Sequence, residues 1–207
     1  MRKRTKRAER GFSLVELLVV VLLIIAVLGF ALLNTSGMMQ NSKANNAMNA
    51  VVNALRQARE MAIAKRRNVE VEFDLPNKIQ LTVLTIPGEA PAATVPPVYL
   101  NDNAPGAATF QLFAGVPDTP MNFGNSQPIN LQQPTGGGAW TVMFTTSGAF
   151  VGTSQSAGTL YATTNNNPVN ASVFFGVSGQ TNTARAVTVF GATGRVRSYK
   201  WNGTWQE

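Results

Sequence analysis

The sequence contains no cysteine and no histidine among its 207 residues. Without thiols or imidazoles, the chain lacks cysteine nucleophiles, histidine bases, disulfides and Cys/His metal sites. Charge is also scarce, because Lys, Arg, Asp and Glu together make up 13% of the residues. A folded domain of this composition must be stabilised mainly by burial of apolar side chains.

The few carboxylates show no catalytic pattern. No two of those beyond residue 33 have the spacing typical of a general acid/base pair, so we expect no enzyme activity. The glycines 136–138 neither follow a predicted strand nor precede a predicted helix, which argues against a phosphate loop. Residues 101–103, Asn-Asp-Asn, lie in a Pro/Gly-rich segment and indicate either a turn or a weak oxygen site for a cation. We therefore expect no cofactor and no metal.

One long apolar run stands out near the N-terminus. Residues 12–33 contain only two polar side chains, Ser13 and Glu16. A helix of this length measures about 33 Å at ~1.5 Å per residue, which is enough to cross a bilayer core. Six Lys/Arg and one acid precede it within residues 1–10. This charge pattern predicts a cytoplasmic N-terminus and an extracytoplasmic bulk.

Three explanations of this segment compete. A secretory signal peptide would have a shorter apolar core and a better cleavage site, and a plain signal anchor leaves Glu16 unexplained. Cleavage between Gly11 and Phe12 would instead create an α-amine four residues before Glu16, on the same helix face. An intramembrane carboxylate usually marks a functional contact, and this amine is the obvious partner. Alternatively, Ser13 and Glu16 have the spacing of a capping box.

The residues RGFSLVELLVV, 10–20, resemble the type III signal of type IV pilins and of type II secretion pseudopilins. The resemblance implies that prepilin peptidase cuts after Gly11, that Phe12 is N-methylated, and that Glu16 neutralises the N-terminal amine, often of a neighbouring subunit. Removal of the leader, residues 1–11, leaves 11 Lys/Arg and 9 Asp/Glu, a net charge of +2. Net charge therefore gives no support to a globally basic nucleic-acid-coating protein.

The helical pattern continues past the apolar run. Ala44, Met48, Val51 and Leu55 begin an apolar stripe that extends to Ala58 and Ala62, with amides on the other side. No proline interrupts residues 12–67, so we predict one helix over this range, transmembrane in 12–33 and then amphipathic. Lys65, Arg66 and Arg67 lie at its predicted C-terminus, where they compensate the helix dipole.

Residues 68–207 predict an all-β extracytoplasmic domain. Alternation in residues 69–74 and 79–83 around Pro-Asn-Lys predicts a hairpin. Nine of eleven prolines lie in residues 87–134, which predicts loops with short edge strands such as ATFQLF. Further strand patterns occur at AWTVMF, GAFVG, TLYAT, ASVFFGV, RAVTVF and GRVRSYKW, and residues 164–170 predict an exposed loop. The expected fold class is α+β: a long helix followed by an antiparallel two-sheet β-sandwich, as in pilins.

Two short motifs, FTTSGAF at 144–150 and GATGRVRSYKW at 191–201, together with the layout, resemble the GspH/FimT branch of pseudopilins and minor pilins. The resemblance implies a minor subunit at or near the filament tip. Its GRxR motif, residues 194–197, looks like the one that DNA-binding members of the FimT group use in natural transformation.

The last predicted strand carries a basic and aromatic pattern that we call the C-terminal stripe: Arg195, Arg197, Tyr199 and Trp201, which share one face by parity. We expect Arg185 to extend it across the hairpin, and Lys200 to add positive charge. Residues 185–207 have a net charge of +3, against −5 for residues 68–184. Such a surface suits nucleic acid. Alternatively, the aromatics cap the sandwich edge, and the arginines stack on them or pair with acids of the first hairpin, Glu70, Glu72 or Asp74.

Two functions follow from these patterns. The first is a structural subunit of a type II secretion pseudopilus or type IV pilus, which contacts other pilins through the N-terminal helix. The second is the same subunit acting as a DNA receptor through the C-terminal stripe. Both imply a single-pass protein of the bacterial inner membrane that is processed by prepilin peptidase and has no catalytic residues.

Overall fold

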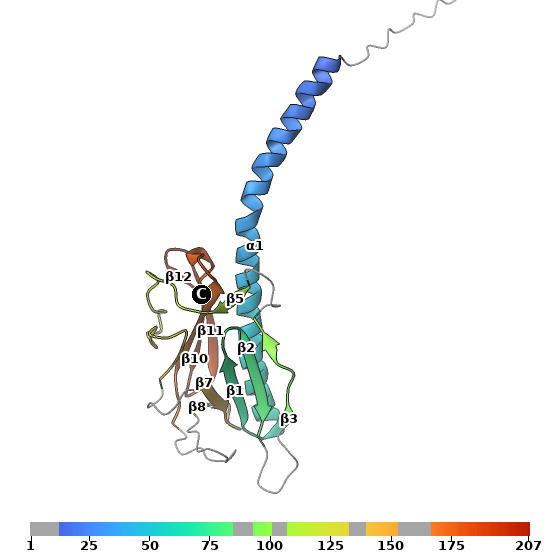
Figure 1. Cartoon of the computed structure of the whole chain (residues 1–207). Helices are drawn as coiled ribbons and strands as arrows, with labels where there is room; N and C mark the ends of the chain where they lie inside the picture. The colour runs from blue at the N-terminus through green and yellow to red at the C-terminus, as the bar shows by residue number, and fades with distance from the viewer. Residues whose placement is uncertain (1–12, 85–92, 101–106, 133–139, 153–166) are drawn as a thin grey trace, which may run out of the picture. The chain divides into compact units, whose positions relative to one another are not determined.

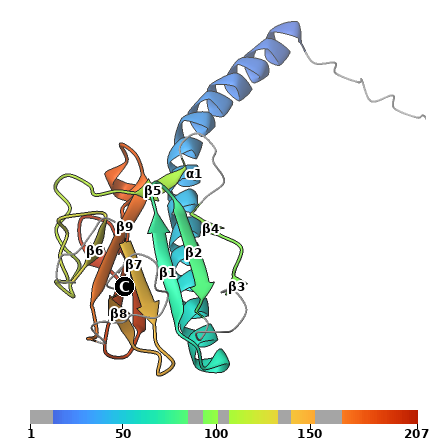
Figure 2. The ribbon, with the colours of Figure 1, turned by 60° about the horizontal axis from the view of Figure 1, so that its bottom comes forward.

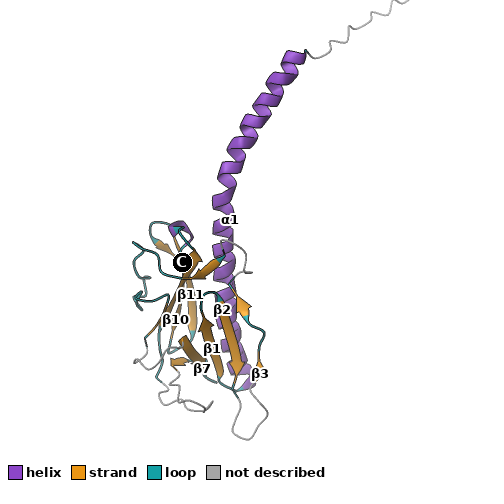
Figure 3. Ribbon diagram, in the orientation of Figure 1, coloured by secondary structure: helices purple, strands orange, loops and turns teal. Residues whose placement is uncertain are grey.

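The structure, a computed structural model, describes residues 13–84, 93–100, 107–132, 140–152 and 167–207, apart from the side chains of residues 30–36 and 93. The segments TLYAT, 101–103 and 136–138 lie outside the described residues. The chain divides into two compact units, Met1–Met39 and Gln40–Glu207, which are described separately below. Within the described residues, one long helix precedes twelve strands and a 3-10 turn. Figures 1 and 3 show the helix and the strands that follow it.

The helix α1, Leu14–Lys65, confirms the predicted long N-terminal helix within two residues at each described end. Each described side chain from Leu14 to Gly29 is exposed. In the part of the chain that the structure describes, we find no helix with an apolar stretch sufficient to cross a membrane.

The C-terminus of α1 ends in a left-handed residue. Arg66 has a φ of 51°, the Arg67 amide donates to the Ala62 carbonyl at 3.2 Å, and the Arg66 amide donates to the Ile63 carbonyl at 3.4 Å. These bonds form a Schellman motif, which satisfies terminal carbonyls and stops the helix. The helix therefore ends at Lys65 rather than at residue 67.

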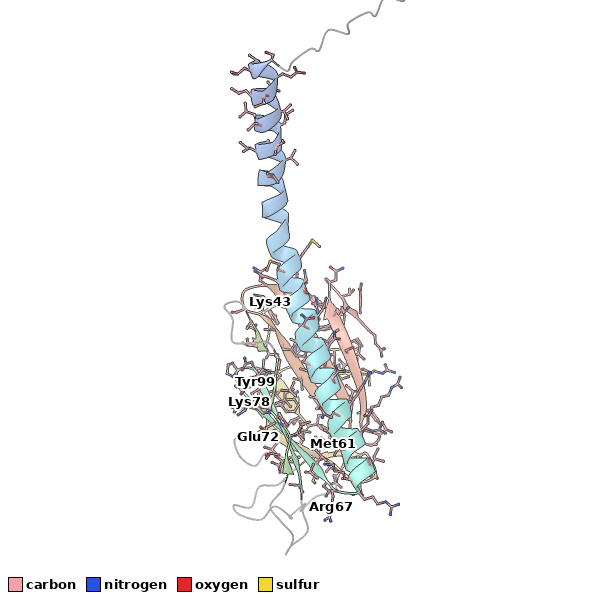
Figure 4. The ribbon with its side chains drawn as sticks, turned by 90° about the vertical axis from the view of Figure 1, so that its right-hand side faces the viewer. Lys43, Met61, Arg67, Glu72, Lys78 and Tyr99 are labelled. Atoms are coloured by element: carbon pink, nitrogen blue, oxygen red, sulfur yellow. The ribbon has the colours of Figure 1, made fainter. Side chains whose placement is uncertain are left out.

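The predicted apolar stripe of α1 packs into the core of the β-rich unit. Its six members are all buried: Ala44, Met48, Val51, Leu55, Ala58 and Ala62. Figure 4 shows this part of the helix lying along the strands. Since the stripe spans only one side, the exposed side of the helix keeps residues such as Asn49, Asn53 and Glu60.

Six strands form the first antiparallel sheet, with order β3-β2-β1-β7-β8 and β4 paired to β2. The strands are β1 Val69–Asp74, β2 Lys78–Val83, β3 Ala93–Thr94, β4 Val98–Tyr99, β7 Trp140–Phe144 and β8 Phe150–Gly152. The predicted hairpin is confirmed, with Val69 opposite Val83 and Asp74 opposite Lys78. Figure 2 shows β1, β2 and β7 side by side.

The second sheet is also antiparallel, with order β12-β11-β10-β9-β5 and β6 paired to β9. Its strands are β5 Ala108–Phe110, β6 Ile129–Leu131, β9 Ala171–Val177, β10 Arg185–Phe190, β11 Arg195–Trp201 and β12 Trp205–Gln206, and a 3-10 turn, η1 Thr181–Thr183, precedes β10. The sequence did not predict β3, β4, β6, β12 or η1, because strands of two or three residues carry almost no periodic signal.

The inner faces of the two sheets and α1 share one core. Phe73 of β1, Phe110 of β5 and Phe175 of β9 form successive edge-to-face contacts, with ring centroids 5.9 and 6.5 Å apart. These contacts join the sheets and confirm the two-sheet α+β fold. One local prediction is wrong: Val169, in the predicted exposed loop 164–170, is buried and donates to the Phe150 carbonyl at 2.9 Å. Residues 164–166 of this loop lie outside the described residues.

Candidate functional sites: the N-terminal motif and the C-terminal strand

The N-terminal motif is described only from Ser13 onward, so the predicted junction between Gly11 and Phe12 lies outside the described residues. Glu16 is exposed and occupies the first turn of α1. Ser13 stands just before the helix, which gives the pair the positions of a capping box. Within residues 13–65, the structure records no side-chain hydrogen bond between Ser13 and Glu16.

The β10–β11 hairpin sets the faces of the C-terminal strand. Arg195 lies opposite Phe190, Arg197 opposite Thr188 and Tyr199 opposite Ala186. Directly opposite residues of an antiparallel pair project from the same face. The odd-numbered residues of β11 thus lie on the outer face of the second sheet, while Val187 and Val189 of β10 point into the core. The predicted shared face of the C-terminal stripe is confirmed.

The prediction that Arg185 extends this stripe is wrong. Arg185 lies opposite Lys200, so both belong to the inner-face register. Arg185 is 4% exposed and contacts α1: its Nε donates to Asn45 Oδ1 at 3.0 Å, and its Nη2 donates to Asn41 Oδ1 at 3.2 Å. Its Nη1 donates to the carbonyls of Asn182 and Ala184. Burial lowers the pKa of Arg185. This side chain ties the helix to the sheet.

The aromatic members of the stripe form a small second core rather than an open stacking surface. Tyr199 is 3% exposed and packs with Phe174 and Ala186, while Met121 and Trp205 lie against this cluster. Trp201 contacts Trp205 edge-to-face, with centroids 5.3 Å apart. Trp205 Nε1 donates to the Pro117 carbonyl at 2.9 Å. This hydrogen bond holds the loop that contains Pro117 against the sheet. Tyr199 is therefore unavailable to a ligand, and Trp201 is only half exposed.

The charged members differ in their partners. Arg197 forms an ion pair with Glu207, Nη1 to Oε2 at 3.3 Å, and not with the hairpin acids that the structural alternative named. A hydrogen bond to Tyr199 and the charge of Glu207 raise the pKa of Arg197. Arg195 and Lys200 are exposed. Of the six predicted DNA-binding residues, three thus retain exposed or half-exposed cationic groups: Arg195, Arg197 and Lys200.

The two short motifs that carried the family resemblance meet in space. Gly194, with a φ of 62°, lies against the Gly148 carbonyl so closely that a Cβ atom would overlap it. Arg59 of α1 donates from Nε to the same carbonyl at 3.3 Å. The TTSG turn, the GATG turn and the helix therefore share one junction. This junction gives the glycine of the GRxR motif a structural role.

Sequence reasoning missed several contact residues. Asn41 and Asn45 lie on the amide-rich face of the helix, for which the sequence indicated only solvent exposure. Trp205 and Glu207 were missed because they follow the last predicted strand. A signal for β12 existed in the Asn-Gly turn after Trp201, since such a dipeptide is typical of hairpins. No group of residues suited to a metal ion occurs among the residues that the structure describes.

Residues 6–32 match the family model of the prokaryotic N-terminal methylation motif. The match supports a type IV pilin-like protein, and such a motif implies processing by prepilin peptidase and assembly with other pilins. Neither the curated proteins nor the solved structures include one that matches the chain. The motif ends before the β-rich unit begins. The comparisons therefore say nothing about the β-rich unit, which is described from its structure alone.

Proposed function

We propose that this chain is a minor pilin or pseudopilin of the GspH/FimT type, anchored in the inner membrane before it joins a type IV pilus or a type II secretion pseudopilus. The methylation motif carries the proposal, because it covers the beginning of a continuous helix with Glu16 in its first turn. The exposed apolar side chains of residues 14–28 need lipid or neighbouring helices around them. The β-rich unit supplies a folded extracytoplasmic domain in this scheme.

Processing is the first test. We expect the mature chain to begin at Phe12 carrying an N-methyl group, as measured by mass spectrometry of the protein from a producing strain. Gly11→Ala should leave the precursor largely uncut, because the peptidase recognises the residue before the scissile bond. Gly29→Ala is the matched control: its Cβ would meet nothing within 4 Å, so processing should be normal. A mature chain that begins beyond Leu33 would contradict the proposal.

Glu16 is tested by incorporation into filaments. Glu16→Leu should permit membrane insertion and processing yet reduce the incorporated fraction by about tenfold or more, because an N-terminal amine would lose its counter-charge in a low-dielectric assembly. Filaments are sheared, and the chain is quantified by immunoblot. Ser13→Ala distinguishes the capping-box role of Glu16 from its role as an assembly contact. If Glu16 acts in a capping box, Ser13→Ala should reduce incorporation as Glu16→Leu does. If Glu16 is an assembly contact, Ser13→Ala should be incorporated normally.

The DNA-receptor alternative rests on the exposed cations Arg195, Arg197 and Lys200. If they bind duplex phosphates, the affinity of the processed chain in neutral detergent should fall with salt at a log–log slope no steeper than about −3, at roughly −0.9 per contact. Arg195→Gln combined with Arg197→Gln should then make the slope about two units shallower. Lys65→Gln, at an exposed cation in the last turn of α1, serves as a control. If the chain does not bind DNA at low salt, or if the double variant keeps the parent slope, the DNA-receptor alternative is wrong and only the structural role remains.

A further inference from the structure

The turn Asn202-Gly203-Thr204 joins β11 to β12. Trp201 pairs with Trp205 at its base, and the Asn202 amide donates to the Thr204 carbonyl at 3.1 Å. All three turn residues are exposed. Asn202 and Gly203 form the only Asn-Gly pair in the sequence. The structure therefore presents this pair to solvent in a defined turn between two paired strands.

Two groups within this pair can react with each other, the side-chain amide of Asn202 and the backbone nitrogen of Gly203. Among the described residues, neither the Asn202 side chain nor the Gly203 N–H forms a hydrogen bond. Gly203 has a φ of 80°, a conformation that favours glycine, and glycine has no Cβ atom to shield its nitrogen. Bond formation between this nitrogen and Asn202 Cγ closes a five-membered ring, which is free of strain. Both reacting groups are therefore accessible and unoccupied.

We propose that Asn202 is a site of spontaneous isoaspartate formation. The Gly203 nitrogen attacks Asn202 Cγ and loses its proton, and the side-chain nitrogen of Asn202 leaves as ammonia. Water then opens the resulting succinimide at either carbonyl, which yields aspartate or isoaspartate. Water is the only co-reactant, and nothing is oxidised or reduced. This modification does not depend on the proposed filament function, because it needs only the turn and solvent.

Isoaspartate changes the turn and the strand that follows it. The residue 202 Cβ enters the main chain, so the turn gains one methylene group, and a carboxylate replaces the amide. Because turn length fixes strand register in a hairpin, the longer turn disturbs the pairing of β11 with β12. β12 contains Trp205, which bonds the Pro117 carbonyl, and it leads to Glu207, which pairs with Arg197. We expect both contacts to weaken after the modification.

Peptide mapping of the full-length chain in neutral detergent tests the site. The purified protein is kept in neutral buffer for several weeks and digested with pepsin at acidic pH, where ring closure is slow. The peptide that contains Asn202 should acquire an oxygen atom in place of an NH group, and isoaspartate methyltransferase should methylate it. Asn49 and Asn53 are exposed controls in the same digest, because the following backbone N–H groups are bonded within α1. No conversion of Asn202, or equal conversion of the helical asparagines, overturns the proposal.

Gly203→Ala tests the attacking nitrogen. The variant should fold, since its Cβ would meet nothing within 4 Å, but the added methyl group should slow conversion of Asn202 about tenfold or more. Conversion at the parent rate would refute the mechanism.

Hydrogen exchange of residues 201–207 measures the effect on β12. Exchange should be faster in the aged parent chain than in the fresh one, because the longer turn weakens the strand pairing. Asn202→Asp is the matched control: it has the new charge without the extra methylene group, so it should exchange like the fresh parent chain. Equal exchange in aged and fresh protein, despite conversion of Asn202, would contradict the expected weakening of β12.

Discussion

Gly194→Ala should lower the free energy of unfolding of this protein by about 2–5 kcal/mol. A φ of 62° costs an L-residue roughly 1–2 kcal/mol, and overpacking a filled site typically costs about 1–3 kcal/mol more. The added Cβ would overlap the Gly148 carbonyl, which also accepts the Arg59 hydrogen bond and so cannot easily move. Urea unfolding of the chain in neutral detergent, followed by tryptophan fluorescence, measures the loss.

Gly203→Ala is the matched control for this prediction. Gly203 has a φ of 80°, but its Cβ would meet nothing within 4 Å. It should therefore lose only the backbone contribution, roughly 1–2 kcal/mol. The difference between the two variants isolates the close approach of the TTSG and GATG turns. Equal losses would show that this close approach contributes nothing to stability.

Replacing both Asn41 and Asn45 by Ala should destabilise the β-rich unit by about 3 kcal/mol. The Arg185 guanidinium is almost fully buried, and the described residues give it no carboxylate, so neutral oxygen atoms must solvate its charge. Hydrogen bonds to a charged group contribute roughly 1.5–3 kcal/mol each, and the loss of two leaves the charge poorly solvated. Urea unfolding measures the difference from the parent chain.

Asn49→Ala combined with Asn53→Ala is the control for this second prediction. Both side chains are exposed on the same helix, so these changes alter helix propensity equally and remove no contact with Arg185. The control should be neutral or slightly stabilising. Asn45→Asp provides a further test. A carboxylate 3.0 Å from Arg185 Nε should accept a charge-assisted hydrogen bond, so this variant should be as stable as the parent chain. If Asn41→Ala/Asn45→Ala matches the control, the tether to α1 is unimportant.

The sequence by itself determined the features whose signals are local. The apolar run with Glu16 can be recognised from the identity of successive residues alone. The stripe from Ala44 to Ala62 can be recognised from the fixed period of a helix. The β1–β2 hairpin and the common face of Arg195 and Arg197 likewise follow from the two-residue period of a strand. These patterns do not depend on contacts with the rest of the chain, because they follow from local backbone geometry.

Only the tertiary structure decided which face of each element is buried and by what. The pairing of Arg185 with Lys200 depends on the register of the GATG turn, and this register moves Arg185 from the predicted stripe to the helix. Tyr199 is buried because Met121 and Trp205 lie over an outer sheet face, and β12 brings Glu207 to Arg197. Such contacts join residues that are distant in the sequence or lie beyond a turn, and residue periodicity contains no information about which surfaces meet.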